Sequence, residues 1–226
     1  MTAILYLYAL VDEEPAAPLG EGITGEPLRL VRRGRIMAVV GELTERPRPE
    51  AETLKRQDEV VCRLSETFDA LLPARFGEAF ADEAELAERI GPRSEDLAAS
   101  LALVRGCVQM TLRIFGEPDP AAADQDDLAD GPGRRYLESR RRERQQARSL
   151  PEIDPLREAL LPLLRAERIE RHTAGRLLGT AYHLVPRSQT EAYIAALETA
   201  KERIGERRIA ASGPWPPYAF GPEAVP

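Results

Sequence analysis

The chain has 226 residues, a formal net charge of −7 and a hydrophobic share of 43%. This length accommodates one or two domains with a sizeable core. The acidic balance argues against a general nucleic-acid binder, which requires a basic face, and no apolar run reaches the roughly 20 residues that span a bilayer. We therefore expect no nucleic-acid partner and no membrane span.

The strand and helix patterns alternate over the first hundred residues. Residues 3–11 are apolar on both faces, which is typical of a central strand. Apolar segments at 28–31 and 36–40 predict a hairpin, with Gly34 available for positive φ in its turn. Apolar residues at helical spacing, including Leu54, then predict a long amphipathic helix over 50–72.

Shorter elements follow this helix. Leu72–Gly77 is expected to form a short strand that begins at Pro73. Residues 82–85 have capping-box spacing, and Ser94 is expected to cap a second helical run. Residues 107–115 alternate between apolar and polar, which predicts a strand with one buried and one exposed face. These elements together predict an α+β domain over residues 1–116.

Two charged residues stand out within apolar surroundings. Arg75 follows an apolar stretch, where burying a charge is costly unless the charge is paired. We favour a buried or half-buried ion pair for Arg75 over an anion or partner contact. Asp58 falls within the apolar stripe of the predicted helix, between Leu54 and Val61, and is a candidate partner for Arg75.

The middle of the chain changes in charge. Residues 117–133 are rich in Asp, Glu and Pro and predict a linker. Arginines crowd residues 134–148, where we favour a solvated helix over a phosphate-binding arm.

A second α+β domain is expected over 134–226. Its predicted elements are a short helix through Leu164, a strand over 177–185, a helix capped by Ser188 with Ile194 on its apolar face, and a short strand over 208–211.

The chain ends in an unusual segment, Gly213–Phe220, which holds the only Trp together with three prolines and two further aromatics. Proline fixes φ and removes an N–H, so this segment is expected to run extended or in tight turns. A stiff segment loses little entropy when it docks. It either packs onto the protein's own body or presents its rings to a partner, and its chemistry leaves both roles open.

Motifs for metal or covalent chemistry are missing from the sequence. Cys62 and Cys107 lie in apolar contexts without a second ligand nearby, which favours free thiols in a reducing cytoplasm. His172 and His183 have no carboxylate or thiol at ligand spacing. The sequence also lacks a Gly-rich phosphate loop and a nucleophile elbow. We therefore expect no metal and no cofactor.

Six segments in order resemble the gas vesicle protein F/L family over nearly the whole chain. They are Tyr6–Val11, Leu71–Phe80, Gly106–Met110, Gly133–Leu137, Ala181–Val185 and Gly213–Phe220. The second, Leu-Leu-Pro-Ala-Arg-Phe-Gly-Glu-Ala-Phe, is similar to the family's most recognisable internal motif. One position departs from the family, because Asp58 stands where a His is expected before Glu59.

The resemblance implies two α+β domains, the first a modified ferredoxin-like fold, and no enzyme activity. It implies an assembly factor or minor component of gas vesicles, found in the cytoplasm and at the vesicle. The implied partners are the small hydrophobic shell protein and other gas vesicle accessory proteins. It favours Trp215 chiefly as a residue that fastens the chain end to the protein. The candidate structural or partner-contact residues are Asp58, Arg75, Phe76, Tyr136, Trp215, Tyr218 and Phe220.

Two other functions stay open at this point. One is a ferredoxin-like small-ligand-binding domain or enzyme that uses a cleft between the domains, which a closed pocket with convergent polar groups near Arg75 would favour. The other is nucleic-acid binding by residues 134–148, which would show steep salt dependence.

Overall fold

The computed structural model describes residues 3–116, 153–172, 175–202 and 208–221. The chain forms two compact units, one containing Met1–Gln109 with Trp215–Pro226 and the other Met110–Pro214. The chain therefore returns to the first unit at its only Trp. Both units mix strands and helices, which confirms the α+β class. The boundaries predicted at residues 116 and 133 and the ferredoxin-like character of the first unit stay predictions.

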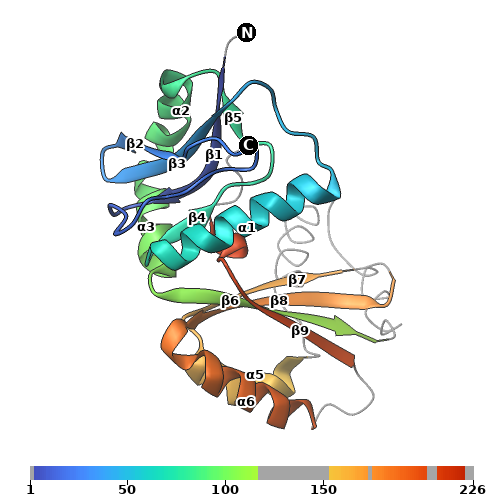
Figure 1. The fold of residues 1–226 in the computed structure, drawn as a ribbon. Coiled ribbons are helices and arrows are strands. Elements are labelled where there is room, and N and C mark those ends of the chain that lie inside the picture. Colours follow the sequence, from blue (N-terminus) through green and yellow to red (C-terminus); the bar gives the residue numbers. More distant parts are fainter. Residues whose placement is uncertain (1–2, 117–152, 173–174, 203–207, 222–226) are drawn as a thin grey trace, which may run out of the picture. The chain divides into compact units, whose positions relative to one another are not determined.

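The first unit contains a sheet built around β1 (Ile4–Val11) (Figure 1). Its strands run in the order β2-β3-β1-β4, and β5 also pairs with β1. The other strands are β2 (Arg29–Arg33), β3 (Ile36–Leu43), β4 (Leu71–Pro73) and β5 (Ala79–Phe80). Residues 5–11 are all buried, as expected for a central strand, and Gly34 turns the β2–β3 hairpin with φ 63°.

Helices cover both faces of this sheet. α1 (Ala51–Thr67) lies on one face, and α2 (Glu83–Ile90) and α3 (Ser94–Val104) lie on the other (Figure 1). The core under α1 combines aromatic and aliphatic side chains, among them Tyr6, Tyr8, Val39, Val60, Val61, Leu64 and Phe68. The helix is shorter than the expected range over 50–72, because the backbone is already extended at Phe68.

Helix starts agree with the sequence at one of three predicted caps. The side chain of Asp82 accepts hydrogen bonds from the backbone N–H groups of Ala84 at 2.8 Å and Glu85 at 2.9 Å, so this cap is confirmed. The predictions for Ser94 and Ser188 are wrong. In both places a 3-10 turn, Gly91–Arg93 or Arg187–Gln189, leads directly into the helix, so no side-chain cap forms there.

Two strand predictions also require correction. β4 ends at Pro73 instead of beginning there, which suits a residue without an N–H at the end of a strand. The strand over 107–115 forms as β6 (Cys107–Phe115), but its polar face is not exposed as expected. Gln109 is only 5% exposed, and Thr111 is buried beside it. Other parts of the protein therefore cover most of the polar face of β6, and Arg113 is its only exposed residue.

The second unit contains a sheet in the order β7-β8-β6-β9. Its further strands are β7 (Ala166–Arg171), β8 (Leu177–Pro186) and β9 (Arg208–Trp215). Helices α5 (Asp154–Leu160) and α6 (Thr190–Lys201) pack against each other on one face of this sheet (Figure 1). Ile194 of α6 is 43% exposed and not on the buried face as expected.

Candidate functional site

The C-terminal aromatic segment, Trp215–Phe220, is part of the first unit. Trp215 is the last residue of β9, which lies at an edge of its sheet, and a 3-10 turn follows over Tyr218–Phe220. The predicted extended course with tight turns is therefore confirmed. Proline has no backbone N–H to donate to a neighbouring strand. An edge strand and a turn both tolerate it, because neither needs that hydrogen bond.

Buried residues of the segment fasten it to the first unit. Pro216 and Pro217 are buried, and Phe220 is only 5% exposed. The backbone N–H of Ala219 donates a 2.8 Å hydrogen bond to the side-chain oxygen of Gln109 on β6. The turn also packs beside β4. This packing explains why the polar face of β6 is covered at Gln109.

Two rings of the same segment keep substantial exposed surface. Trp215 is 38% exposed and Tyr218 is 42% exposed. Leu54 on α1 is 43% exposed, although its spacing had placed it on the apolar stripe. Leu54 and Asp58 are one turn apart on the same face of α1, and Asp58 contacts Tyr218. The segment thus combines buried anchors with two exposed rings, one of which contacts α1 through Asp58.

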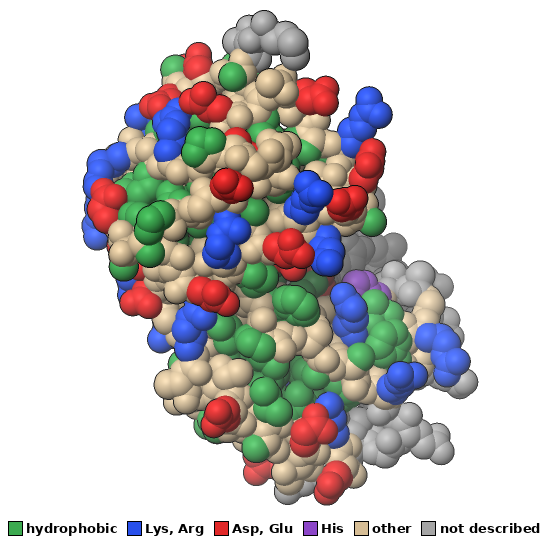
Figure 2. All heavy atoms as spheres, in the orientation of Figure 1, with side chains coloured by type: hydrophobic (Ala, Val, Ile, Leu, Met, Phe, Trp, Pro, Cys, Tyr) green, Lys and Arg blue, Asp and Glu red, His purple; other side chains and the backbone are tan. Residues whose placement is uncertain are grey.

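Hydrophobic side chains on the surface stand among charged ones. Figure 2 shows hydrophobic groups in green that are interrupted by Lys and Arg in blue and by Asp and Glu in red. A surface of this kind can contact a protein partner specifically without exposing a large hydrophobic patch.

Asp58 is held by Tyr218 and not by Arg75. The Tyr218 hydroxyl donates to Asp58 Oδ1 at 3.2 Å. Partial burial, together with the Asp58 carboxylate, raises the pKa of Tyr218 well above its ordinary value, so the phenol remains a donor. The prediction that Arg75 sits in a buried or half-buried ion pair is wrong. Its side chain is exposed and makes no ion pair within the described residues, because the chain has already turned away from the core after β4.

The buried polar residue of α1 is Gln57, the neighbour of Asp58. Its side-chain oxygen accepts a hydrogen bond from the Tyr6 hydroxyl, and its amide donates to the Ala74 carbonyl at 3.4 Å. The Tyr6 hydroxyl also accepts from the backbone N–H of Gly77 at 3.0 Å. This network fixes the turn that carries Arg75 and the half-buried Phe76.

A double-mutant cycle on Asp58→Ala and Tyr218→Phe tests this contact. We expect a coupling of about 0.5–1 kcal/mol in the free energy of unfolding, since the hydrogen bond is partly exposed to water. Urea denaturation of the four proteins measures it. The pair Asp58→Ala and Arg75→Ala is the control and should show additive effects, whereas coupling there and none with Tyr218 would contradict the geometry.

The second unit holds a buried polar network that the sequence patterns did not reveal. His183, 2% exposed on β8, places Nδ1 2.7 Å from the Tyr193 hydroxyl of α6. Its Nε2 lies 3.3 Å from a carboxylate oxygen of Glu167 on β7. The other oxygen of Glu167 accepts a 2.8 Å hydrogen bond from Arg157 of α5. His183 is thus hydrogen-bonded to Tyr193 through Nδ1, while its Nε2 faces the Glu167 oxygen without forming a hydrogen bond.

The described residues hold neither a cluster of metal-ligating side chains nor a membrane-spanning helix. Within them, no group of three or more His, Cys, Asp or Glu side chains is arranged to hold a metal ion. None of the helices among these residues is long and apolar enough to cross a membrane. Tyr136 and the arginine-rich residues 134–148 lie outside the described residues, so their proposed roles stay predictions.

Comparison with known families identifies the chain's relationships. The model for gas vesicle synthesis protein GvpL/GvpF matches residues 4–222. The chain belongs to the GvpL/GvpF family. This result confirms the resemblance inferred from the six sequence segments and places the protein among those that act in gas vesicle formation.

Curated GvpL/GvpF relatives match over almost their full lengths. Gas vesicle protein L of a Streptomyces species is 28% identical and aligns over 95% of this chain and 91% of its own length. Gas vesicle protein L2 of Halobacterium salinarum is 29% identical, with 96% of this chain and 91% of the relative aligned.

Two solved structures of the family share the fold. GvpF from Anabaena sp. PCC7120 superposes with a TM-score of 0.74 at 18% identity, covering 98% of this chain and 97% of that one. GvpF from Microcystis aeruginosa gives a TM-score of 0.73 at 19% identity, covering 97% and 99%. At this identity the likeness establishes the fold of a GvpL/GvpF protein.

Proposed function

We propose that this protein is a non-enzymatic assembly factor or minor component of gas vesicles that binds the hydrophobic shell protein. The observation that carries the proposal is the C-terminal aromatic segment. It exposes Trp215 and Tyr218 while Pro216, Pro217 and Phe220 are buried. Membership in the GvpL/GvpF family supplies the setting, and the cytoplasm and the vesicle surface are the proposed locations.

Preorganised aromatic rings favour binding of an apolar subunit. A subunit that is itself apolar gains most from rings that are already held in place, since binding then costs little side-chain or backbone entropy. Aromatic residues dominate the binding energy of many interfaces because each ring contributes a large area through few rotatable bonds. Leu54 is an exposed aliphatic residue one helical turn from Asp58, the residue of α1 that contacts Tyr218.

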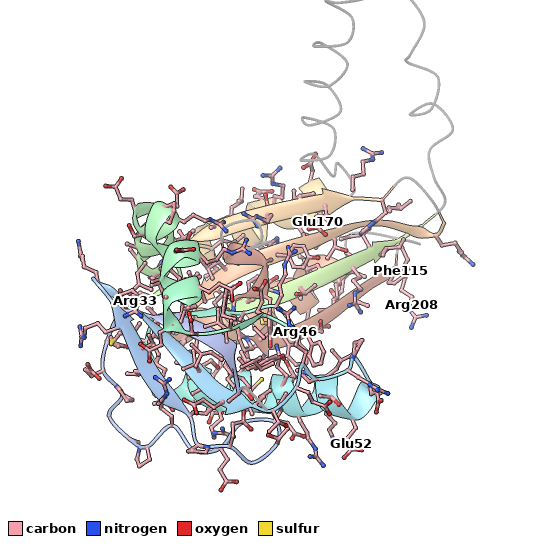
Figure 3. All side chains as sticks on the ribbon, turned by 90° about the horizontal axis from the view of Figure 1, so that it is seen from above. Arg33, Arg46, Glu52, Phe115, Glu170 and Arg208 are labelled. Carbon is pink, nitrogen blue, oxygen red and sulfur yellow. The ribbon has the colours of Figure 1, made fainter. Side chains whose placement is uncertain are left out.

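Exposed charged pairs on α1 support reversible binding. On α1, Lys55 lies 3.7 Å from Glu59, and Arg56 lies 2.8 Å from Glu52, which is labelled in Figure 3. These exposed pairs add little stability, but they keep the surface hydrated when no partner is bound. We therefore propose that the protein holds aggregation-prone shell subunits, or helps to nucleate them, without trapping them.

Gene deletion with complementation tests the proposal in cells. We expect deletion to abolish or strongly reduce gas vesicles, and the wild-type gene to restore them, as counted by electron microscopy. Trp215→Ala should restore roughly tenfold fewer vesicles, because it removes an exposed anchor. Ile194→Ala is the matched control, since this residue is 43% exposed but lies in the second unit.

The outcomes separate the proposal from its alternatives. Vesicles of normal number after deletion would contradict the assembly role. If Trp215→Ala restored vesicles to the wild-type number, the assembly role would stand, but Trp215 would not contribute to it. For the alternative of a small-ligand domain or enzyme, no specific contact among the described residues gives support, and we do not propose it.

A further inference from the structure

Three arginines belong to, or lie against, the turn between β4 and β5 that carries Glu78. Arg75 and Glu78 belong to this turn, in which the Glu78 N–H donates to the Arg75 carbonyl at 3.3 Å. Arg46, labelled in Figure 3, donates to the carbonyl of the next residue, Ala79, at 2.9 Å. Arg89 is contributed by α2, which packs against β5. We call Arg46, Arg75, Glu78 and Arg89 the Arg75 cluster.

Burial and the three guanidinium charges have opposite effects on the pKa of Glu78. Partial burial raises the pKa of Glu78, whereas the charges of Arg89, Arg75 and Arg46 each lower it. The cluster therefore contains three positive charges and a single half-buried negative charge. The four members of the cluster sum to a net charge of +2, on a chain whose net charge is −7.

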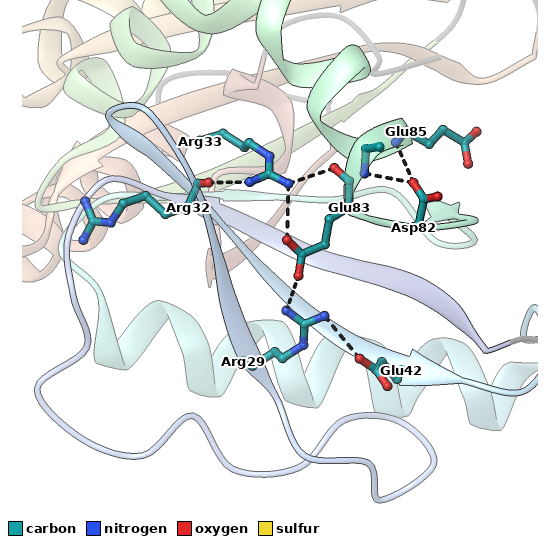
Figure 4. A network of polar contacts seen from close by, with 8 residues as sticks. Arg29, Arg32, Arg33, Glu42, Asp82, Glu83 and Glu85 are labelled. Carbon is teal, nitrogen blue, oxygen red and sulfur yellow. Dashed lines mark hydrogen bonds and ion pairs between the residues drawn. The ribbon is translucent and has the colours of Figure 1, made fainter.

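Several other arginines of the first unit have their charge matched by a carboxylate. Arg29 lies 2.8 Å and Arg33 lies 3.2 Å from Glu83 oxygens, and Arg29 also reaches Glu42 at 3.2 Å (Figure 4). Arg105 bridges Asp12 at 2.6 Å and Glu13 at 3.2 Å. In the described part of the chain, neither Arg75 nor Arg89 takes part in an ion pair of this kind.

The backbone beneath the cluster is fixed. The Ala74 N–H donates to the Tyr8 carbonyl at 2.9 Å, and the Gly77 N–H donates to the Tyr6 hydroxyl at 3.0 Å. The Leu7 N–H donates to the Glu78 carbonyl at 2.9 Å, so the turn is tied to β1 at both ends. Arg75 is thus presented on a rigid support, which lowers the entropy lost when a partner binds.

We propose that the Arg75 cluster, with the half-buried Phe76 beside it, is a docking surface for a carboxylate-bearing segment of a protein partner. This rests on the proposed function, so the partner is expected to be another gas vesicle protein. Arginine and aromatic side chains are enriched in protein interfaces, and arginine binds carboxylates through paired donors. Glu78 disfavours a phosphate or nucleic acid, because its charge would repel a polyanion, whereas a polypeptide can offer an N–H or a cation to it.

A synthetic acidic peptide tests the surface directly. The probe is a ten-residue peptide of three glutamates, one lysine and six serines, so that it offers both carboxylates and a cation, and it is titrated against the full-length protein and followed by amide chemical shifts. We expect shifts centred on residues 75–78 and 89, binding that weakens with salt, and about a tenfold loss of affinity for Arg75→Glu. Arg35→Glu is the matched control, because Arg35 is an exposed arginine on the β2–β3 hairpin of the same unit, and it should bind like the wild type.

The same two variants in gene-deleted cells connect the surface to function. Arg75→Glu should restore fewer vesicles than Arg35→Glu, with melting temperatures of both proteins within a few degrees of the wild type. Equal peptide affinity for Arg75→Glu and wild type, or tighter binding of inorganic phosphate or a DNA 20-mer than of the peptide, would overturn the inference. If gene deletion left the number of vesicles unchanged, the proposed function would be wrong. The peptide titration would still show whether the Arg75 cluster binds carboxylates, because it does not depend on vesicle formation.

Discussion

Replacing Phe220 with alanine is expected to lower the free energy of unfolding of the first unit by about 3 kcal/mol. Phe220 is 5% exposed and anchors the 3-10 turn that follows Pro216 and Pro217. Removing its ring leaves a cavity at the point where the returning chain end meets the rest of the unit. The single Trp, at position 215, reports directly on this region during guanidinium denaturation.

Tyr218→Ala is the matched control for Phe220→Ala. Both substitutions remove an aromatic ring from the same turn. Tyr218, however, is 42% exposed, so its replacement removes less buried surface, together with the hydrogen bond to Asp58. We expect it to cost less than half as much as Phe220→Ala. Equal costs, or a larger cost for Tyr218→Ala, would show that the segment is not anchored through Phe220.

A loss of about 2 kcal/mol is also expected for Glu167→Gln in the second unit, because the hydrogen bond from Arg157 then loses its charged and largely buried acceptor. Glu167 lies between His183 at 3.3 Å and Arg157 at 2.8 Å. Glu170→Gln on the same strand is the control. Its carboxylate, labelled in Figure 3, is exposed and accepts a 3.0 Å hydrogen bond from Tyr182. We expect its cost to stay below about 1 kcal/mol.

The same network predicts a pH dependence of defined sign. The His183 imidazole, followed by the Arg157 charge, lowers the pKa of Glu167 below its ordinary value of 4.5. A lowered folded-state pKa means that the unfolded chain binds the proton first. The stabilisation is therefore complete above about pH 5 and is lost as pH falls through the folded-state pKa. Burial raises the pKa of Tyr193, so this phenol stays neutral throughout.

Measurements of unfolding between pH 3 and pH 7 check this sign. Wild type and Glu170→Gln should both lose stability as pH falls, whereas Glu167→Gln should show a flatter profile in the acidic range. A Glu167→Gln profile parallel to that of the wild type would show that the carboxylate contributes nothing through its charge.

Local patterns predicted most of the elements. The apolar run of β1, the period of α1 and the turn at Gly34 each follow from a few neighbouring residues, and they appear in the structure. β7 was missed because four of its six residues are charged, which resembles a solvated segment more than a strand. β5 is too short, with two residues, to produce a pattern.

The contacts that define the candidate site could not be read from local patterns. Asp58 meets Tyr218 across 160 positions of sequence, and Gln109 meets Ala219 across 110. Such pairs depend on where the chain end returns, which spacing does not encode. Arg75 illustrates the same limit, since its apolar neighbours suggested burial while the turn after β4 leaves its side chain exposed.

The role of Trp215 links these results to function. The segment itself is fastened to the first unit, as the buried Phe220 and prolines show, yet Trp215 retains 38% of its surface. That Trp215 serves chiefly to fasten the chain end stays a prediction. The proposed function instead uses the exposed part of the Trp215 ring. Measuring both the stability and the shell-protein binding of Trp215→Ala separates the fastening role from the binding role.

Retention of the purified shell protein on the immobilised protein tests the central claim most directly. We expect the wild type and Ile194→Ala to retain it equally, and Trp215→Ala to retain roughly tenfold less while remaining folded by circular dichroism. Failure of the intact, folded wild-type protein to retain any shell protein would contradict the account.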